Sequence, residues 1–204
     1  MDAGTVAWVW YFRLMEGKMM KQFWFMVCAI FLSGSLASAE VGDDGLHKAP
    51  WMRDTFKDLS EDLADANAEG KRLMVIIEQR GCIYCKKMHE TVFPITKVAD
   101  YIDQNFFVVQ INMFGDVEVT DFDGISLPEK EMVRRWGALF TPSILFFPES
   151  VSGDSVASKA AVATMPGAFG MHTTFNMLNW VVEHGYDGEE SFQKYHARKF
   201  SEQG

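Results

Sequence analysis

The sequence is poor in three features, and each scarcity excludes a class of protein. Only 3 of the 204 residues are cysteine, so this is not a small domain held together by several disulfides. Acids outnumber bases, and the formal net charge of −9 argues against nucleic acid as a partner, because a nucleic-acid-binding protein needs a basic surface. No apolar run reaches the roughly 18 residues that a membrane-spanning helix needs. By contrast, 48% of the residues are hydrophobic, which excludes extensive disorder and suits one domain with a real core.

The N-terminal part has the pattern of an export signal. Residues 22–32 form a short apolar block, preceded by Lys18 and Lys21 and followed by small residues that end at Ala39. This order predicts a secretory signal peptide over 1–39, cleaved after Ala39, and therefore a periplasmic protein. A buried core helix or an uncleaved anchor is the alternative. Two methionines directly follow the first 18 residues, so we expect those 18 to be a start-site extension.

The rest of the chain is expected to form a flexible lead-in over 40–50, one domain over 51–187 and a C-terminal extension over 188–204. Apolar spacing predicts helices over 54–68, 82–92, 95–104, 129–136, 171–184 and 189–200, and strands over 73–77, 106–111, 143–147 and 157–164. A parallel pair of strands followed by an antiparallel pair, with helices on both faces, predicts an α/β fold with a central mixed sheet.

The strongest chemical signal is a cysteine pair at the start of a helix. Cys82 and Cys85 are separated by two residues and follow a predicted buried strand and a turn. A thiolate at a helix N-terminus faces unpaired N–H groups and the positive end of the helix dipole, so Cys82 is the expected nucleophile. Cys85 lies one helical turn further on, where it can attack a mixed disulfide at Cys82 and release the product.

Two other interpretations of the pair stay open. A purely structural disulfide would close so short a loop that it would stabilise little. Alternatively, His89 shares the helix face of Cys82 and Cys85, and the three could bind zinc or copper. Covalent haem is excluded, because Lys86 and not a histidine follows Cys85.

Further motifs extend the pattern beyond the pair. They are Gly81-Cys82-Ile83-Tyr84-Cys85-Lys86-Lys87-Met88, the stretch 115–127 with Glu129-Lys130-Glu131 after it, and Phe140-Thr141-Pro142-Ser143. Over roughly residues 51–185 the chain resembles the thioredoxin superfamily, and within it the SoxW-type periplasmic thioredoxins of sulfur-oxidation loci.

The resemblance implies a thioredoxin fold in which Pro142 is cis and faces the cysteine pair. It implies that Cys82 and Cys85 are the catalytic nucleophile and resolving thiol, assisted by Pro142. The substrate-binding residues would then be Thr141, Ile83 and Tyr84. The expected reaction is thiol–disulfide exchange with protein substrates and no bound cofactor.

The SoxW likeness favours reduction, with electrons from a membrane thiol transporter of the CcdA or DsbD kind. The alternatives are an oxidase or isomerase of the same fold, a periplasmic copper or zinc handler that uses Cys82, Cys85 and His89, and a non-catalytic thioredoxin-like binding module.

The sequence also departs from the thioredoxin pattern. Cytosolic thioredoxins have Trp before the first cysteine and Gly-Pro between the pair, whereas this chain has Gly81 and Ile83-Tyr84. Thioredoxins carry a buried Asp for proton transfer six residues before the nucleophile, where this chain has Ile76. Glu78 shares the strand face of Ile76 and could act as the base instead, or it could be a solvated residue at the strand end.

An acidic loop lies between the predicted second strand and the helix over 129–136. Its carboxylates belong to Asp116, Glu118, Asp121 and Asp123, a grouping that could bind calcium. The spacing is not that of an EF-hand, so a solvated loop that shapes partner contacts is the favoured interpretation.

Overall fold

The computed structural model describes residues 40–202, and the predicted signal peptide over 1–39 lies outside these residues. The strands are β1 (Glu40–Val41), β2 (His47–Lys48), β3 (Met52–Arg53), β4 (Arg72–Glu78), β5 (Phe106–Asn112), β6 (Glu118–Thr120), β7 (Ser126–Pro128), β8 (Ser143–Phe146) and β9 (Ala163–Pro166). The helices are α2 (Leu59–Ala68), α3 (Ile83–Thr91), α4 (Thr96–Asn105), α5 (Glu129–Trp136), α6 (Ala157–Ala160), α7 (Met171–Val182) and α8 (Phe192–Ser201), with the 3-10 turn η1 (Gly185–Asp187). None of the helices described is long and apolar enough to cross a membrane.

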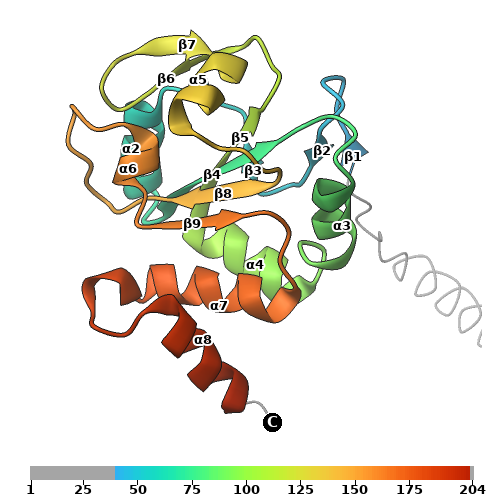
Figure 1. Ribbon diagram of the computed structural model, residues 1–204, viewed down its shortest axis with the longest axis vertical. Helices are drawn as coiled ribbons and strands as arrows, with labels where there is room; N and C mark the ends of the chain where they lie inside the picture. The colour runs from blue at the N-terminus through green and yellow to red at the C-terminus, as the bar shows by residue number, and fades with distance from the viewer. Residues whose placement is uncertain (1–39, 203–204) are drawn as a thin grey trace, which may run out of the picture. The chain divides into compact units, whose positions relative to one another are not determined.

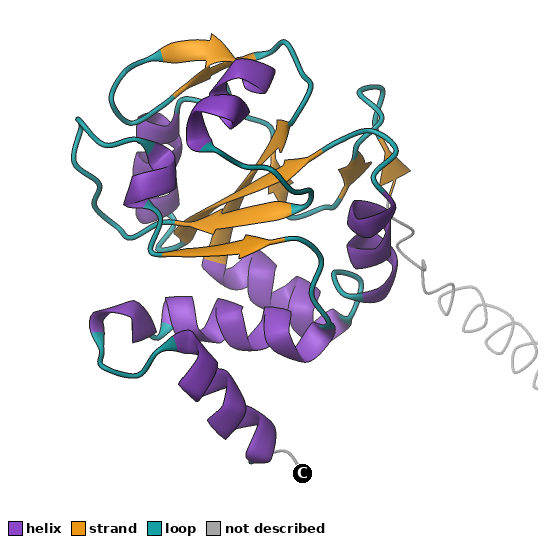
Figure 2. Ribbon diagram, in the orientation of Figure 1, coloured by secondary structure: helices purple, strands orange, loops and turns teal. Residues whose placement is uncertain are grey.

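The central sheet is mixed, with the strand order β3-β5-β4-β8-β9. β3 and β4 run parallel to β5, whereas β8 runs antiparallel to β4 and β9 antiparallel to β8. Figures 1 and 2 show helices above and below this sheet. The predicted α/β fold with a parallel pair followed by an antiparallel pair is therefore confirmed.

The side chains of β4 alternate between two apolar cores. Met74 and Ile76 belong to the core under α3, α4, α7 and α8, and Leu73, Val75 and Ile77 to the core under α2, α5 and α6. This alternation follows from the period of two along a strand, and burial on both faces explains why β4 reads as one continuous apolar run. Glu78 continues the row of Met74 and Ile76, so the pleat directs its carboxylate toward the α3 side of the sheet.

The edge strand predicted over 157–164 is present as β9, but its predicted start is wrong. Residues Ala157–Ala160 form α6, and β9 begins only at Ala163 and runs to Pro166. Ala157 is fully buried, and its backbone N–H donates to the Asp121 carboxylate, which holds the helical turn against the acidic loop. The alternation of small residues resembled a strand, but alanine is the strongest helix former.

The first predicted helix begins later than its apolar spacing suggested. Asp58 caps α2 by accepting hydrogen bonds from the backbone N–H groups of Ser60 and Glu61, so the helix starts at Leu59 rather than at residue 54. Phe56, which the spacing assigned to the buried face, is 95% exposed.

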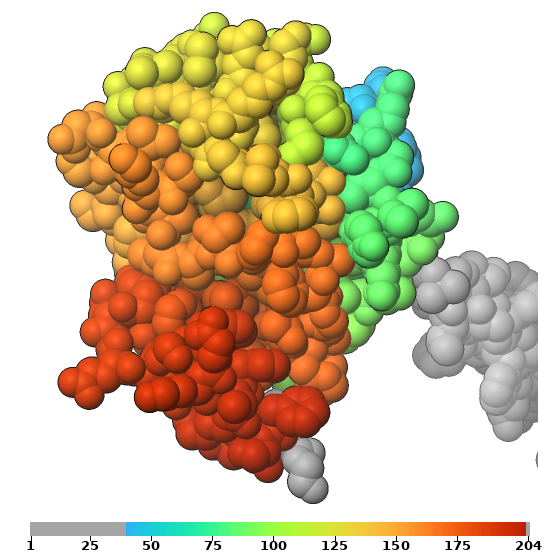
Figure 3. Space-filling model, in the orientation of Figure 1, coloured from blue at the N-terminus to red at the C-terminus, as the bar shows by residue number. Residues whose placement is uncertain are grey.

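Both ends of the described chain are folded. Residues 40–50, expected as a flexible lead-in, include the β1–β2 hairpin, and Leu46 in its turn is buried. At the other end, α8 lies within the segment expected as a C-terminal extension. Its Tyr195 is buried against the core and donates a hydrogen bond to Glu183. Figure 3 shows the red atoms of this segment directly against the orange atoms of α7 and β9.

Candidate functional site

The cysteine pair lies at the start of α3, just after the end of the central strand β4. β4 ends at Glu78, and Gly81 turns the chain with a φ of +71°, a value that glycine adopts without steric cost. Cys82 is the N-cap of α3, and its Sγ accepts the backbone N–H of Cys85 at 3.0 Å. A disulfide joins the two residues, whose Cα atoms are 5.2 Å apart. The predicted placement of both cysteines at the start of a helix is confirmed.

The two sulfurs differ in burial. Both cysteines are buried, Cys82 at 7% exposed somewhat less completely than Cys85 at 1%. An outer cysteine at a helix N-terminus and an inner one beneath it suit the two steps of disulfide exchange, in which one thiol meets the partner and the other resolves the intermediate.

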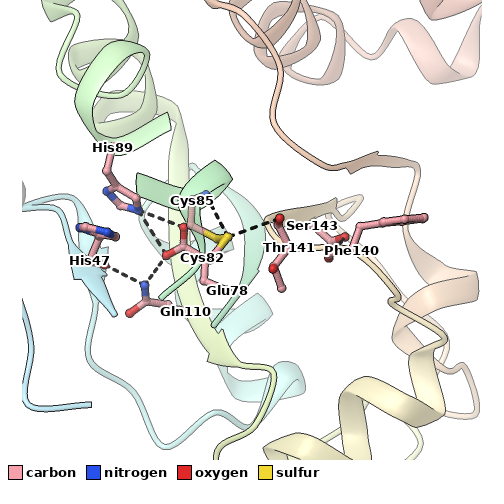
Figure 4. Close-up of a disulfide and its surroundings, with 9 residues drawn as sticks. All are labelled: His47, Glu78, Cys82, Cys85, His89, Gln110, Phe140, Thr141 and Ser143. Carbon is pink, nitrogen blue, oxygen red and sulfur yellow. Dashed lines mark hydrogen bonds and ion pairs between the residues drawn. A yellow bond between two sulfur atoms is a disulfide. The ribbon is translucent and has the colours of Figure 1, made fainter. Parts of the chain in front are cut away.

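The segment before β8 comes close to the outer sulfur, as Figure 4 shows. The Thr141–Pro142 peptide bond is cis, and the carbonyl oxygen of Thr141 lies 3.5 Å from the Sγ of Cys82. Ser143 supports the turn, because its hydroxyl donates to the carbonyl oxygen of Phe140 at 2.7 Å. The structure thus brings together residues that are 59 positions apart in the chain.

Exposed apolar side chains surround this junction. They are Ile83, Tyr84, Phe114, Leu139 and Phe140, each more than half exposed. A shallow groove of about 310 Å³ runs between Tyr84, Thr141 and Gly167. Apolar surface that stays exposed beside a reactive group is typical of a binding site for another protein. Sequence reasoning found Ile83, Tyr84 and Thr141 but missed the three other apolar residues, since nothing local marks a loop phenylalanine as exposed.

A buried polar cluster lies on the inner side of the pair. Glu78 is 1% exposed, so the interpretation of it as a solvated strand-end residue is wrong. Its carboxylate is 3.1 and 3.2 Å from the Nε2 of His89 and accepts a 2.6 Å hydrogen bond from the Nε2 of Gln110. A buried carboxylate needs such partners, because an isolated charge in the interior is very costly.

The β1–β2 hairpin covers this cluster. The ring of His47 stacks on that of His89 with centroids 5.1 Å apart, and Lys48 donates to the side-chain oxygen of Gln110 at 2.7 Å. Burial lowers the pKa of His47, and the neighbouring His89 lowers it further. Sequence reasoning missed Gln110 and the hairpin; the one signal was a glutamine in the otherwise apolar strand Phe106–Ile111.

The contacts of His89 in this cluster test the alternative that it binds zinc or copper together with the two cysteines. Its Nε2 is directed at Glu78 and not at the sulfurs. Among residues 40–202, no three His, Cys, Asp or Glu side chains are grouped so that they could hold a metal ion. The zinc or copper site of Cys82, Cys85 and His89 therefore has no support in the described part of the chain.

The acidic stretch is only in part the solvated loop that was favoured. Asp116 and Glu118 are exposed, but the stretch contains the β6–β7 hairpin, and Asp121 at its turn is fully buried. The Asp121 carboxylate accepts from the Trp136 indole at 2.8 Å, from the backbone of Ala157 at 2.9 Å and from Arg135, which also pairs with Asp123. These donors occupy the carboxylates that a calcium site would need, so this segment is a structural anchor.

Comparison with known proteins supports the same fold. Residues 59–156 match a family model described as a thioredoxin-like domain. A thioredoxin-fold protein from Helicobacter pylori superposes with a TM-score of 0.50 at 17% identity, over 65% of this chain and 86% of that one.

Two curated relatives are both named thiol:disulfide interchange protein DsbD. The one from Pseudoalteromonas atlantica is 29% identical over 102 residues, and the one from Colwellia psychrerythraea is 24% identical over 132 residues. The alignments cover 48% and 65% of this chain but only 16% and 20% of the relatives. The chain therefore has a thioredoxin fold that holds the Cys82–Cys85 disulfide, and over residues 59–156 it is similar to thioredoxin-like domains.

Proposed function

We propose that the protein is an exported thiol–disulfide oxidoreductase that reduces disulfides in other proteins. The observation that carries this proposal is the arrangement of the pair: Cys82 caps a helix beside the Thr141 carbonyl, and Cys85, one turn further on, is the more deeply buried of the two. A purely structural disulfide would need neither a position at a helix N-terminus nor exposed apolar side chains around it.

The reaction has two exchange steps. The thiolate of Cys82 attacks a substrate disulfide, an S–S bond forms between Cys82 and one substrate sulfur, and the other substrate sulfur leaves as a thiolate that takes up a proton. Cys85 then loses its proton and attacks Cys82, so that the Cys82–Cys85 disulfide forms and the second substrate thiol is released. The protein is oxidised by two electrons and the substrate is reduced by two.

We infer that Glu78 receives the proton that Cys85 loses. Its carboxylate is buried at the end of β4, on the core side of the pair, where bulk water cannot serve as the base. An extended substrate segment would pair with the backbone of Thr141 while its apolar side chains contact Ile83, Tyr84 and Phe140.

The source of electrons is part of the proposal. The predicted signal peptide would send the protein to the periplasm, where a membrane thiol transporter of the CcdA or DsbD kind would reduce the pair again. The resemblance to SoxW-type thioredoxins and the similarity to two proteins named DsbD support this direction of electron flow.

Insulin reduction with dithiothreitol as electron donor tests the activity. The protein should accelerate precipitation of the insulin B chain, and Cys82→Ser should abolish the acceleration. A wild-type protein that binds unfolded substrates without accelerating reduction would instead be a binding module, and the proposal would fail.

A further inference from the structure

The cluster beneath the cysteines links four segments of the chain through side chains that are mostly buried. Glu78 ends β4, His89 lies on α3 and Gln110 lies on β5 (Figure 4). The fourth segment is β2, whose Lys48 donates to Gln110. Glu78 and His89 are each only 1% exposed, and Gln110 is 7% exposed. Because burying a polar group is costly, a cluster of this kind is retained where packing or chemistry requires it.

His89 is placed to respond to events at Cys85. The two residues are four positions apart on α3, so their side chains lie on one face of the helix, one turn apart. The Nε2 of His89 is 3.1 Å from the Glu78 carboxylate. In the view of Figure 4, that carboxylate lies between the His89 ring and the disulfide. The Glu78 carboxylate is thus already in contact with an imidazole on the helix that carries Cys85.

The surrounding charges form pairs of their own. Lys48 pairs with Asp44 at 2.6 Å in the hairpin, and Lys86 pairs with Glu90 at 3.6 Å on α3. Gln110 is neutral. Burial and the proximity of His89 keep the pKa of His47 below its ordinary value where it stacks on His89. Glu78 and His89 are the carboxylate and the imidazole of the cluster that contact each other directly.

We propose that His89 is a positioning residue that shares one proton with Glu78, and that this pair, covered by the β1–β2 hairpin, takes up the proton of Cys85 during the resolving step. The inference rests on the proposed function. When the mixed disulfide is resolved, the Cys85 thiol loses its proton to the pair, and the Cys82–Cys85 bond forms as the substrate thiolate leaves. When the disulfide is reduced again, Cys85 leaves as a thiolate and recovers the proton.

The resolving step can be measured directly with an aromatic disulfide whose thiolate absorbs visible light. Reaction at Cys82 releases one coloured thiolate, and attack by Cys85 releases the second, so stopped-flow absorbance separates the two steps. In the wild type, the rate of the second release should follow pH with an inflection that belongs to the Glu78–His89 pair. Glu78→Gln should remove this inflection and slow the second release at neutral pH by about tenfold or more.

His89→Gln keeps a hydrogen-bond donor toward Glu78 but cannot titrate in this range. It should move the inflection by about half a pH unit or more while the first release at Cys82 stays unchanged. His196→Gln is the matched control. His196 hydrogen-bonds to Asn176 between α8 and α7, so its replacement should leave both releases as in the wild type.

A second measurement needs no variant. The imidazole of His89, followed by NMR across pH in the wild-type protein, should titrate differently in the oxidised and reduced forms. If His89→Gln leaves the pH profile of the second release unchanged, or if the ring titrates identically in both forms, His89 is a packing residue and the inference is wrong. If no mixed disulfide forms at Cys82, the proposed function itself has failed.

Discussion

The sulfur of Cys82 occupies the position that a serine or aspartate oxygen usually takes at a helix N-terminus. It accepts the N–H of Cys85, whereas the sulfur of Cys85 faces the core. In the reduced protein we expect this arrangement to favour a thiolate at Cys82 over one at Cys85.

Alkylation of the reduced protein should therefore distinguish the two cysteines. Near neutral pH, limiting iodoacetamide should modify Cys82 at least about tenfold faster than Cys85, because only the first is both activated and accessible. Peptide mass mapping at short times measures the ratio. Equal rates, or faster labelling of Cys85, would contradict the assignment of nucleophile and resolving thiol.

A second residue-scale prediction concerns Asp121, whose carboxylate holds Trp136, Arg135 and α6 together. Asp121→Ala leaves several buried donors without an acceptor and should lower the free energy of unfolding by about 3 kcal/mol. Asp116→Ala is the control, since the Asp116 side chain is 77% exposed and its ion pair with Lys130 contributes about 1 kcal/mol or less. Urea denaturation measures both, and similar losses would show that Asp121 is no anchor.

The sequence could not show which side chains are buried by distant segments of the chain. Strand periodicity put Glu78 on the correct face but could not show that the β1–β2 hairpin and α3 close over it. The helical spacing of His89 was equally correct, yet the side chain pairs with Glu78 and not with the sulfurs. Partners supplied by other segments leave no local pattern in the sequence.

The helix α2 carries a prediction about pH. Burial raises the pKa of Asp62 to about 6, from an ordinary value of 3.8. The folded protein therefore holds a proton that the unfolded chain has lost between about pH 4 and 6, so stability falls as pH rises through this window. We expect a loss of about 2 kcal/mol, because the groove that borders Asp62 is open to water and reduces the full effect.

Asp62→Asn should flatten this dependence and stabilise the protein above pH 6. Asp100→Asn changes an exposed carboxylate on α4, away from Asp62, and should leave the pH dependence as it is. Urea midpoints at a series of pH values between 4 and 7 compare the three proteins. Unchanged pH dependence in Asp62→Asn would show that the carboxyl group titrates alike in the folded and unfolded states.

Long elements with a clear period were predictable, and short ones were not. The apolar run of β4 and the helix over 129–136 were expected from the sequence and are present. The bounds of the strand predicted over 157–164 were wrong because α6 and β9 have only four residues each, which is too few for a distinctive pattern. Long-range contacts determine the secondary structure of such short segments. Asp121 accepts from the first residue of α6, and β8 pairs with β9.

At the scale of the whole molecule, the C-terminal segment completes the core under α7. Tyr195 of α8 is buried and donates to Glu183, and Phe192 contacts Trp180 edge to face. Tyr195→Ala should cost about 3 kcal/mol of stability. Phe200→Ala should cost little, because Phe200 is 62% exposed. Thermal unfolding measures both effects. A negligible effect of Tyr195→Ala would show that α8 does not contribute to the stability of the domain.

The central claim is that Cys82 exchanges disulfides with other proteins and that Cys85 resolves the product. Trapping tests it most directly: Cys85→Ser protein is incubated with a disulfide-containing unfolded protein, and the products are separated without reductant. The account predicts a mixed disulfide through Cys82 that persists in Cys85→Ser, is short-lived in the wild type and does not form in Cys82→Ser. A Cys85→Ser variant that forms no mixed disulfide while its Cys82 thiol still alkylates readily would contradict it.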